Sequence, residues 1–158
     1  MGLDMYLSKR TWVGNQYVDE DGRQIKVAIT ATGDVSRIKE ERITEVTEQV
    51  GYWRKANAIH GWFVKNVQGG SDDCEEYPVS REQLEELLDL CKRIRGDKKK
   101  PKLNVEIAKK ELPTVEGFFF GSTDYNEDYL ADIEETIAIL TAVLEDEDWE
   151  ELYYQSSW

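Results

Sequence analysis

The first third of the chain carries an alternation of apolar and polar residues that is typical of half-buried strands. Residues 3–13 begin with this alternation, residues 23–31 repeat it after turn chemistry that includes Asn15, and residues 43–50 are rich in threonine and valine. Apolar side chains at every second position would line one face of a sheet. Gly51 is suited to end the third segment. The pattern predicts three antiparallel strands.

Further along the chain, apolar residues recur at the spacing of an α-helix. Residues 52–68 have this spacing and predict a first main helix. A second main helix should begin at Ser80, because Ser80 and Gln83 match a capping box, and Gly96 is placed to end it. Residues 105–110 predict a short helix in the connection that follows.

Two aromatic segments in the last third of the chain predict further strands. Residues 118–120 are three phenylalanines between glycines, and residues 149–158, which we expect beside them, are rich in strand-forming aromatics. Between these segments, apolar spacing predicts a third main helix that ends near Glu145. Three residues are available to cap its start: Ser122, Thr123 or Asp124.

Together these elements predict a fold of the α+β class. We expect a single domain, residues 1–158, with an antiparallel sheet made from the N-terminal strands, residues 118–120 and the C-terminal strand. Three main helices would cover this sheet. The length is sufficient to bury a hydrophobic core without disulfides or metals.

The charge of the chain is concentrated at one end. The formal net charge is −13, and all of this excess falls in residues 112–158, which contain no Lys or Arg. Such a surface repels duplex nucleic acid, so direct binding to a duplex is not expected. A solvated acidic helix is the ordinary interpretation. The alternative is an acidic inhibitor whose 124–151 face imitates nucleic acid and docks a basic host protein.

The sequence also predicts a cytoplasmic protein without a cofactor. No apolar run approaches the roughly 20 residues of a membrane span, and the N-terminus lacks the order of a signal peptide. Cys74 and Cys91 have no metal-binding spacing and are expected to be reduced thiols. The common phosphate-loop, dinucleotide, serine-hydrolase and zinc-protease motifs are absent.

Candidate ligand-binding chemistry gathers in two places, the segment 52–68 and the turn before the third helix. Arg54 offers a forked donor for phosphate, and Ser122 would lie at a helix N-terminus, where anions are favoured. Aromatic rings could stack on a base. The full candidate set is Tyr52, Trp53, Arg54, Asn57, His60, Ser122 and Tyr125. The alternative interpretation places Trp53 and His60 in the core and makes Ser122 only a cap.

Acidic residues of the third helix allow a different chemistry. Asp128 and Asp132 are four residues apart, and Asp132 and Glu135 are three apart, so each pair shares a helical face. Such a face could hold a divalent metal and support a small carboxylate hydrolase. These spacings also arise by chance on any acidic helix, and we therefore expect no metal site.

Several segments resemble a family of small phage and prophage proteins. They read MGLDMYL at the start, GYWRKANAIHGWFV, VSREQLEELL, LPT with GFFFGSTDY, and YYQSSW at the end. The resemblance covers nearly the whole chain apart from residues 98–110 and the region of residues 15–33. It implies a non-structural accessory role in an infected bacterium, directed against host defence. No functional residue is carried over from this family.

The sequence thus favours non-catalytic binding over an enzyme. The expected ligand is a small phosphorylated, nucleotide-like molecule such as a defence signal in the host cytoplasm. Arg54 and the Ser122 turn would hold its phosphate, while Trp53 or Tyr125 would stack on its base. A basic host protein is the alternative partner, and a homo-oligomer is compatible with the sequence.

Overall fold

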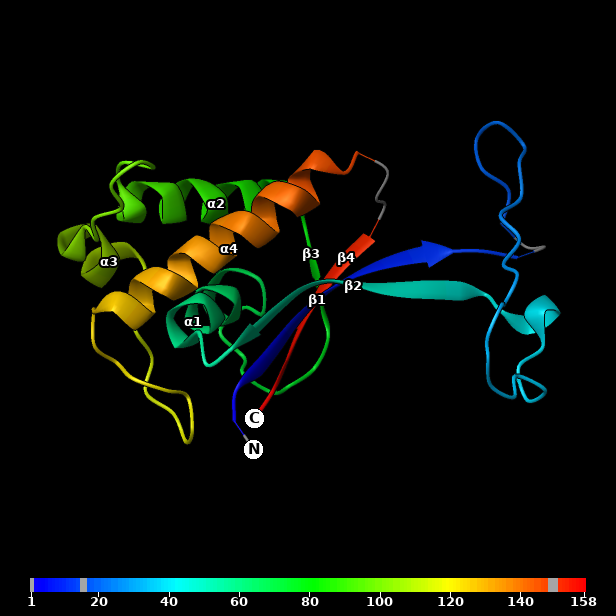
Figure 1. Cartoon of the computed structure of the whole chain (residues 1–158), viewed down its shortest axis with the longest axis horizontal. Helices are drawn as coiled ribbons and strands as arrows, with labels where there is room; N and C mark the ends of the chain where they lie inside the picture. The colour runs from blue at the N-terminus through cyan, green and yellow to red at the C-terminus, as the bar shows by residue number, and fades with distance from the viewer. Residues whose placement is uncertain (1, 15–16, 148–150) are drawn as a thin grey trace.

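A computed structural model describes residues 2–14, 17–147 and 151–158, and it has an α+β fold. The four strands form one antiparallel sheet in the order β2-β1-β4-β3. Their bounds are β1 Asp4–Trp12, β2 Glu45–Arg54, β3 Tyr77–Val79 and β4 Glu151–Ser157. The first and last strands of the chain are therefore neighbours, and both termini lie at the same end of the sheet (Figure 1).

The α-helices lie together at one end of the molecule, beside the half of the sheet where β4 pairs with β1 and β3 (Figure 1). Their bounds are α1 Asn57–Asn66, α2 Arg81–Arg95, α3 Val105–Glu111 and α4 Glu127–Glu145, with a short 3₁₀ helix at Glu40–Arg42. Helix α4 packs against α2 and against β2. No helix among the described residues has the length and apolar character needed to cross a membrane.

The core forms where the helices meet one face of the sheet. Met5 and Leu7 of β1 are fully buried, while Asp4, Tyr6 and Ser8 are only half-buried. This is the alternation that the sequence shows. On β2, Gly51 leaves room for Ile139 of α4, because a Cβ atom at this glycine would lie 2.8 Å from the Ile139 side chain. Close packing of α4 on the sheet thus requires a glycine here.

Helix α2 agrees with its prediction at both ends. The Ser80 side chain accepts a hydrogen bond from the Gln83 backbone N–H at 3.2 Å, and the Gln83 side chain accepts one from the Ser80 N–H at 2.9 Å. Gly96, with φ of 71°, ends the helix. The short helix α3 and the C-terminal strand are also confirmed. Residue 15 and the first residues of segment 149–158 lie outside the described part of the chain.

Two predicted strands are wrong. Residues 23–31 form no strand. The segment lies beyond the end of the paired β1 and β2 and away from helices α1 to α4 (Figure 1), and half of Ile25 is exposed. Residues 118–120 form a turn with Phe119 at φ of 64°. Phe118 is 82% exposed and only Phe120 enters the core. Strand β4, which was expected beside residues 118–120, lies between β1 and β3 instead.

Two helix starts also differ from the prediction. Residues 52–54 end strand β2 because they pair with β1, so helix α1 begins only at Asn57. Helix α4 begins at Glu127, and its cap is Asn126, whose side chain accepts hydrogen bonds from two backbone N–H groups of the first turn. Ser122 therefore does not cap this helix. The short strand β3 was not predicted.

Candidate functional site

A pocket of about 240 Å³ opens where β2 passes into α1, opposite the first turns of α4. The connection between α3 and α4, residues 112–126, closes its third side. We call it the Arg54 pocket. Its lining residues are Arg54, Lys55, Asn57, Ala58, Thr114, Gly121, Ser122, Asp124, Asn126, Asp128, Tyr129 and Asp132. Three of the residues predicted from the sequence therefore meet in one place: Arg54, Asn57 and Ser122.

Two adjacent cations come from the end of strand β2. Lys55 has a left-handed backbone, with φ of 61°, and its N–H donates to the Leu3 carbonyl at 2.8 Å. This conformation is uncommon for a residue with a Cβ atom and turns the chain from the strand toward the helix. Gly121 lies against it, because a Cβ atom at Gly121 would come within 3.2 Å of the Lys55 backbone oxygen. The 112–126 connection thus packs directly on the backbone that carries the two cations.

Asn57 fixes the 112–126 connection to helix α1. Its amide nitrogen donates to the carbonyl oxygens of Phe120 and Ser122, at 3.2 and 2.8 Å, and its amide oxygen accepts from the Val115 N–H at 3.0 Å. Asn57 is almost completely buried. Since its two donor hydrogens and its oxygen are already used, Asn57 holds the wall of the pocket in place. This is a positioning role within the candidate site.

The Ser122 turn forms part of this wall. The Ser122 hydroxyl accepts a hydrogen bond from the Asp124 N–H at 3.1 Å, which gives the turn its local shape. Ser122 is exposed and lines the pocket. Ser122 therefore reaches the pocket as a turn residue, without the helix N-terminus that the sequence suggested.

Three aspartates line the pocket, Asp124 from the connection and Asp128 and Asp132 from α4. Burial, followed by the nearby charges of Glu135 and Asp128, raises the pKa of Asp132 from 3.8 to about 7. Near neutral pH both the neutral and the ionised form of this carboxyl group are therefore populated. Asp128 and Asp132, which share a helical face, both line the pocket.

The cations and the carboxylates of the pocket do not pair with each other. Among the described residues, no ion pair within 4.0 Å joins Arg54 or Lys55 to an aspartate of the pocket. Arg54 is 61% exposed, and its Nε lies 4.0 Å from Asp4 outside the pocket. The hydroxyl of Tyr52 donates to the same Asp4 oxygen at 2.5 Å. Opposite charges thus share one pocket without neutralising each other.

The aromatic candidates lie elsewhere. Trp53 is fully buried, and its indole N–H donates to the Thr136 hydroxyl at 3.0 Å, so it belongs to the core and cannot stack on a ligand. Tyr52 lies on the opposite face of the sheet, where its ring contacts Tyr6. The hydroxyl of Tyr125 accepts from the backbone of Thr114 at 3.2 Å. Tyr125 supports the wall from behind and does not line the pocket.

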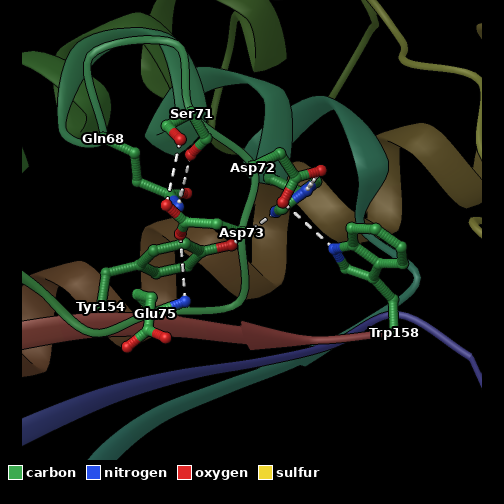
Figure 2. A network of polar contacts seen from close by, with 8 residues as sticks. Gln68, Ser71, Asp72, Asp73, Glu75, Tyr154 and Trp158 are labelled. Atoms are coloured by element: carbon green, nitrogen blue, oxygen red, sulfur yellow. Dashed lines mark hydrogen bonds and ion pairs between the residues drawn. The ribbon is translucent and has the colours of Figure 1, made fainter.

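His60 does not line the Arg54 pocket and belongs to a second polar cluster with Asp72 and Tyr154, both labelled in Figure 2. The ring is 1% exposed. Its Nδ1 lies 2.8 Å from the Tyr154 hydroxyl, and its Nε2 lies 3.0 Å from the Asp72 carboxylate. The other Asp72 oxygen accepts from the Trp158 indole N–H at 3.1 Å. The cluster joins helix α1, the 69–76 loop and strand β4.

Hydrogen-bonding capacity assigns the protons of this cluster. A carboxylate only accepts hydrogen bonds, so the Nε2 of His60 is the donor to Asp72, and in the neutral ring Nδ1 is then an acceptor. The Tyr154 hydroxyl must then donate to Nδ1. Burial raises the pKa of Tyr154 well above its ordinary value, which keeps that proton in place. His60 and Tyr154 are buried with their polar atoms paired, as the core interpretation of His60 predicts.

Lys55, Thr114 and Tyr129 are among the lining residues that sequence reasoning missed. Lys55 is next to Arg54 in the chain, and its left-handed backbone lies where both residues line one pocket. Tyr129 is almost fully buried and its hydroxyl donates to the Leu112 carbonyl at 2.8 Å. The four-residue spacing of Asp128 and Asp132 did indicate that they share one face of a helix. That spacing could not show which way the helix would face.

The described residues contain no group of three or more His, Cys, Asp or Glu side chains arranged to hold a metal ion. Comparison of the chain with protein-family models, curated proteins and solved structures finds no match.

Proposed function

We propose that the protein binds a small phosphorylated ligand in the Arg54 pocket and does not transform it. The observation that carries this proposal is the pair of adjacent cations, Arg54 and Lys55, beside the Ser122 turn. The arginine fork pairs with two phosphate oxygens, and the lysine ammonium adds a compact charge. Within the part of the chain that the structure describes, Lys55 has no ion-pair partner, so its charge is available to a ligand.

The size and protonation of the pocket support a ligand of mononucleotide size. Its volume of about 240 Å³ is slightly below the roughly 300–1,000 Å³ of sites for drug-sized ligands. The raised pKa of Asp132 leaves this carboxyl group partly neutral near pH 7, which lowers the repulsion of a phosphate. The wall is held rigidly by Asn57, which reduces the ordering that binding would require.

The resemblance to phage and prophage proteins supplies a biological setting for this binding. A non-structural phage protein that captures a nucleotide-like molecule in the host cytoplasm would lower the concentration of a defence signal. Capture requires a stable complex and no chemical step. This setting agrees with a pocket whose described residues offer charge and hydrogen bonds.

Titration calorimetry with the four ribonucleoside 5′-monophosphates tests the proposal. We expect at least one of them to bind and to be recovered unchanged, as judged by mass spectrometry. Arg54→Gln and Lys55→Gln should each weaken that binding by about tenfold, since a hydrogen bond to a charged group contributes roughly 1.5–3 kcal/mol. Glutamine keeps a long polar side chain and removes the charge.

Lys65→Gln is the matched control, because Lys65 is a lysine of helix α1 that does not line the Arg54 pocket. This variant should bind as the natural protein does. Equal affinity in folded Arg54→Gln and Lys55→Gln proteins would contradict the proposal, and so would the absence of binding by all four mononucleotides. Recovery of a chemically altered ligand would contradict its non-catalytic part.

A further inference from the structure

Charges of both signs line the Arg54 pocket without pairing across it, and a phosphate uses only the positive ones. Arg54 and Lys55 come from the end of β2, whereas Asp128 and Asp132 come from the first turns of α4. Among the residues that the structure describes, none of these four side chains forms an ion pair with another. A phosphate held by the cations would leave the carboxylates on α4 without partners.

The two carboxylates are placed to act together. Asp128 and Asp132 are one helical turn apart on α4, so their side chains project from the same face toward the same pocket. Asp128 is exposed and Asp132 is half-buried. An ionised carboxylate only accepts hydrogen bonds, and the chemical complement of this wall is therefore a group with several N–H donors.

We propose that the ligand is a purine nucleotide whose base presents adjacent N–H donors, as guanine does, with Asp132 and Asp128 accepting from the base while Arg54 and Lys55 hold the phosphate. This inference rests on the proposed function and adds the class of base. The Watson–Crick edge of guanine offers the N1–H and the N2 amino group side by side. These two donors match the two oxygens of one carboxylate.

Other bases fit this wall less well. The corresponding edges of adenine and cytosine place an amino group beside a ring nitrogen that accepts, and an ionised carboxylate would oppose that lone pair. Hypoxanthine keeps the N1–H and lacks the amino group. A comparison of guanine with hypoxanthine therefore isolates the hydrogen bond of the amino group. A comparison of guanine with adenine tests the N1 position, which donates in guanine and accepts in adenine.

Calorimetry at pH 8, where Asp132 is mainly ionised, tests this assignment. The probes are guanosine, inosine and adenosine 5′-monophosphates, together with ribose 5-phosphate, guanosine and phosphoethanolamine. We expect guanosine 5′-monophosphate to bind about tenfold or more tightly than the inosine and adenosine compounds, the ratio expected for one lost hydrogen bond to a charged acceptor. Asp132→Asn and Asp128→Asn should reduce this preference. Glu134→Gln, an exposed position on α4 outside the pocket, should retain it.

The probes separate failure of this inference from failure of the phosphate site. Equal binding of all nucleotides and ribose 5-phosphate would overturn the base assignment and leave the phosphate site standing. Tighter binding of phosphoethanolamine than of any nucleotide would also overturn it, in favour of a simple amine. Guanosine that binds as tightly as its 5′-monophosphate, and indifferently to Arg54→Gln, would support the base contact and contradict the phosphate site. No binding by any probe would overturn both.

Discussion

Replacement of Asp132 by asparagine should stabilise the protein, and the gain should depend on pH. Burial raises the pKa of this carboxyl group to about 7 from 3.8. The folded state therefore prefers the neutral acid, and ionising the group costs free energy of folding. The stability that the neutral acid contributes is fully present below about pH 3.8, and it is lost progressively as the pH rises through 7. Asparagine imitates the neutral acid at every pH.

The size of this effect follows from the difference between the two pKa values. About three pKa units correspond to an upper bound of roughly 4 kcal/mol at about 1.4 kcal/mol per unit. Asp132 is only half-buried, and solvent screening reduces the expected gain to about 1–2 kcal/mol above pH 7.

Urea unfolding of both proteins between pH 5.5 and 8.5 measures the difference. The advantage of Asp132→Asn should grow as the pH approaches 7 and then level off. Glu134→Gln, on the exposed side of the same helix, should differ from the natural protein by less than about 0.5 kcal/mol throughout. An Asp132→Asn advantage that is absent at pH 8, or that is equally large at pH 5.5, would refute the assignment of a buried, destabilising carboxylate.

Two further substitutions test the polar contacts that hold the fold around α1. Asn57→Ala removes three buried or part-buried hydrogen bonds to the 112–126 connection and should lower the free energy of unfolding by about 2–4 kcal/mol in urea titrations. Asn66→Ala removes one side-chain hydrogen bond at the other end of α1 and should lower the free energy of unfolding by less than about 1 kcal/mol. Equal losses in the two variants would contradict the role of Asn57 in holding the 112–126 connection. Tyr154→Phe leaves His60 Nδ1 without its donor and should cost about 1–2 kcal/mol in thermal unfolding. Tyr153→Phe, at a half-buried position on the same strand, is its control, and a smaller loss in Tyr154→Phe than in Tyr153→Phe would count against the proton assignment.

Elements whose signals are local were predictable from the sequence. Helix α2 is the clearest case, because the capping box at Ser80 and the glycine at Gly96 fix its ends through contacts within a few residues. The alternation in residues 3–13 was also sufficient, since β1 is buried on one face along its first half. In these elements, the local preference and the tertiary structure agree.

Elements that depend on a distant partner were less predictable. Residues 23–31 have the alternation of a strand, but no described strand pairs with them. The spacing of residues 52–68 suits a helix, yet pairing with β1 takes residues 52–54 into the sheet. The run 118–120 is apolar, but only Phe120 is buried. A short apolar run does not by itself distinguish strand from turn.

In the candidate site too, local chemistry was predictable from the sequence, whereas features that depend on distant contacts were not. Arg54, Asn57 and Ser122 were selected for their chemistry, and the structure brings them to one pocket. The predicted reason was partly wrong, because Ser122 is a turn residue and Arg54 ends a strand. Lys55 was missed since a left-handed backbone at a lysine has no signature in the sequence. The direction in which Asp128 and Asp132 face is decided by the packing of α4 on the sheet.

The position of β4 between β1 and β3 determines when the sheet can be completed. Residues 151–157 are synthesised long after β1, yet they provide one of its two neighbours in the sheet. Until they emerge from the ribosome, one edge of β1 is unpaired and β3 has no neighbouring strand. Contacts of such long sequence separation slow folding. The native sheet should therefore form only after residues 151–157 have been synthesised, through a late step in which β4 inserts between β1 and β3.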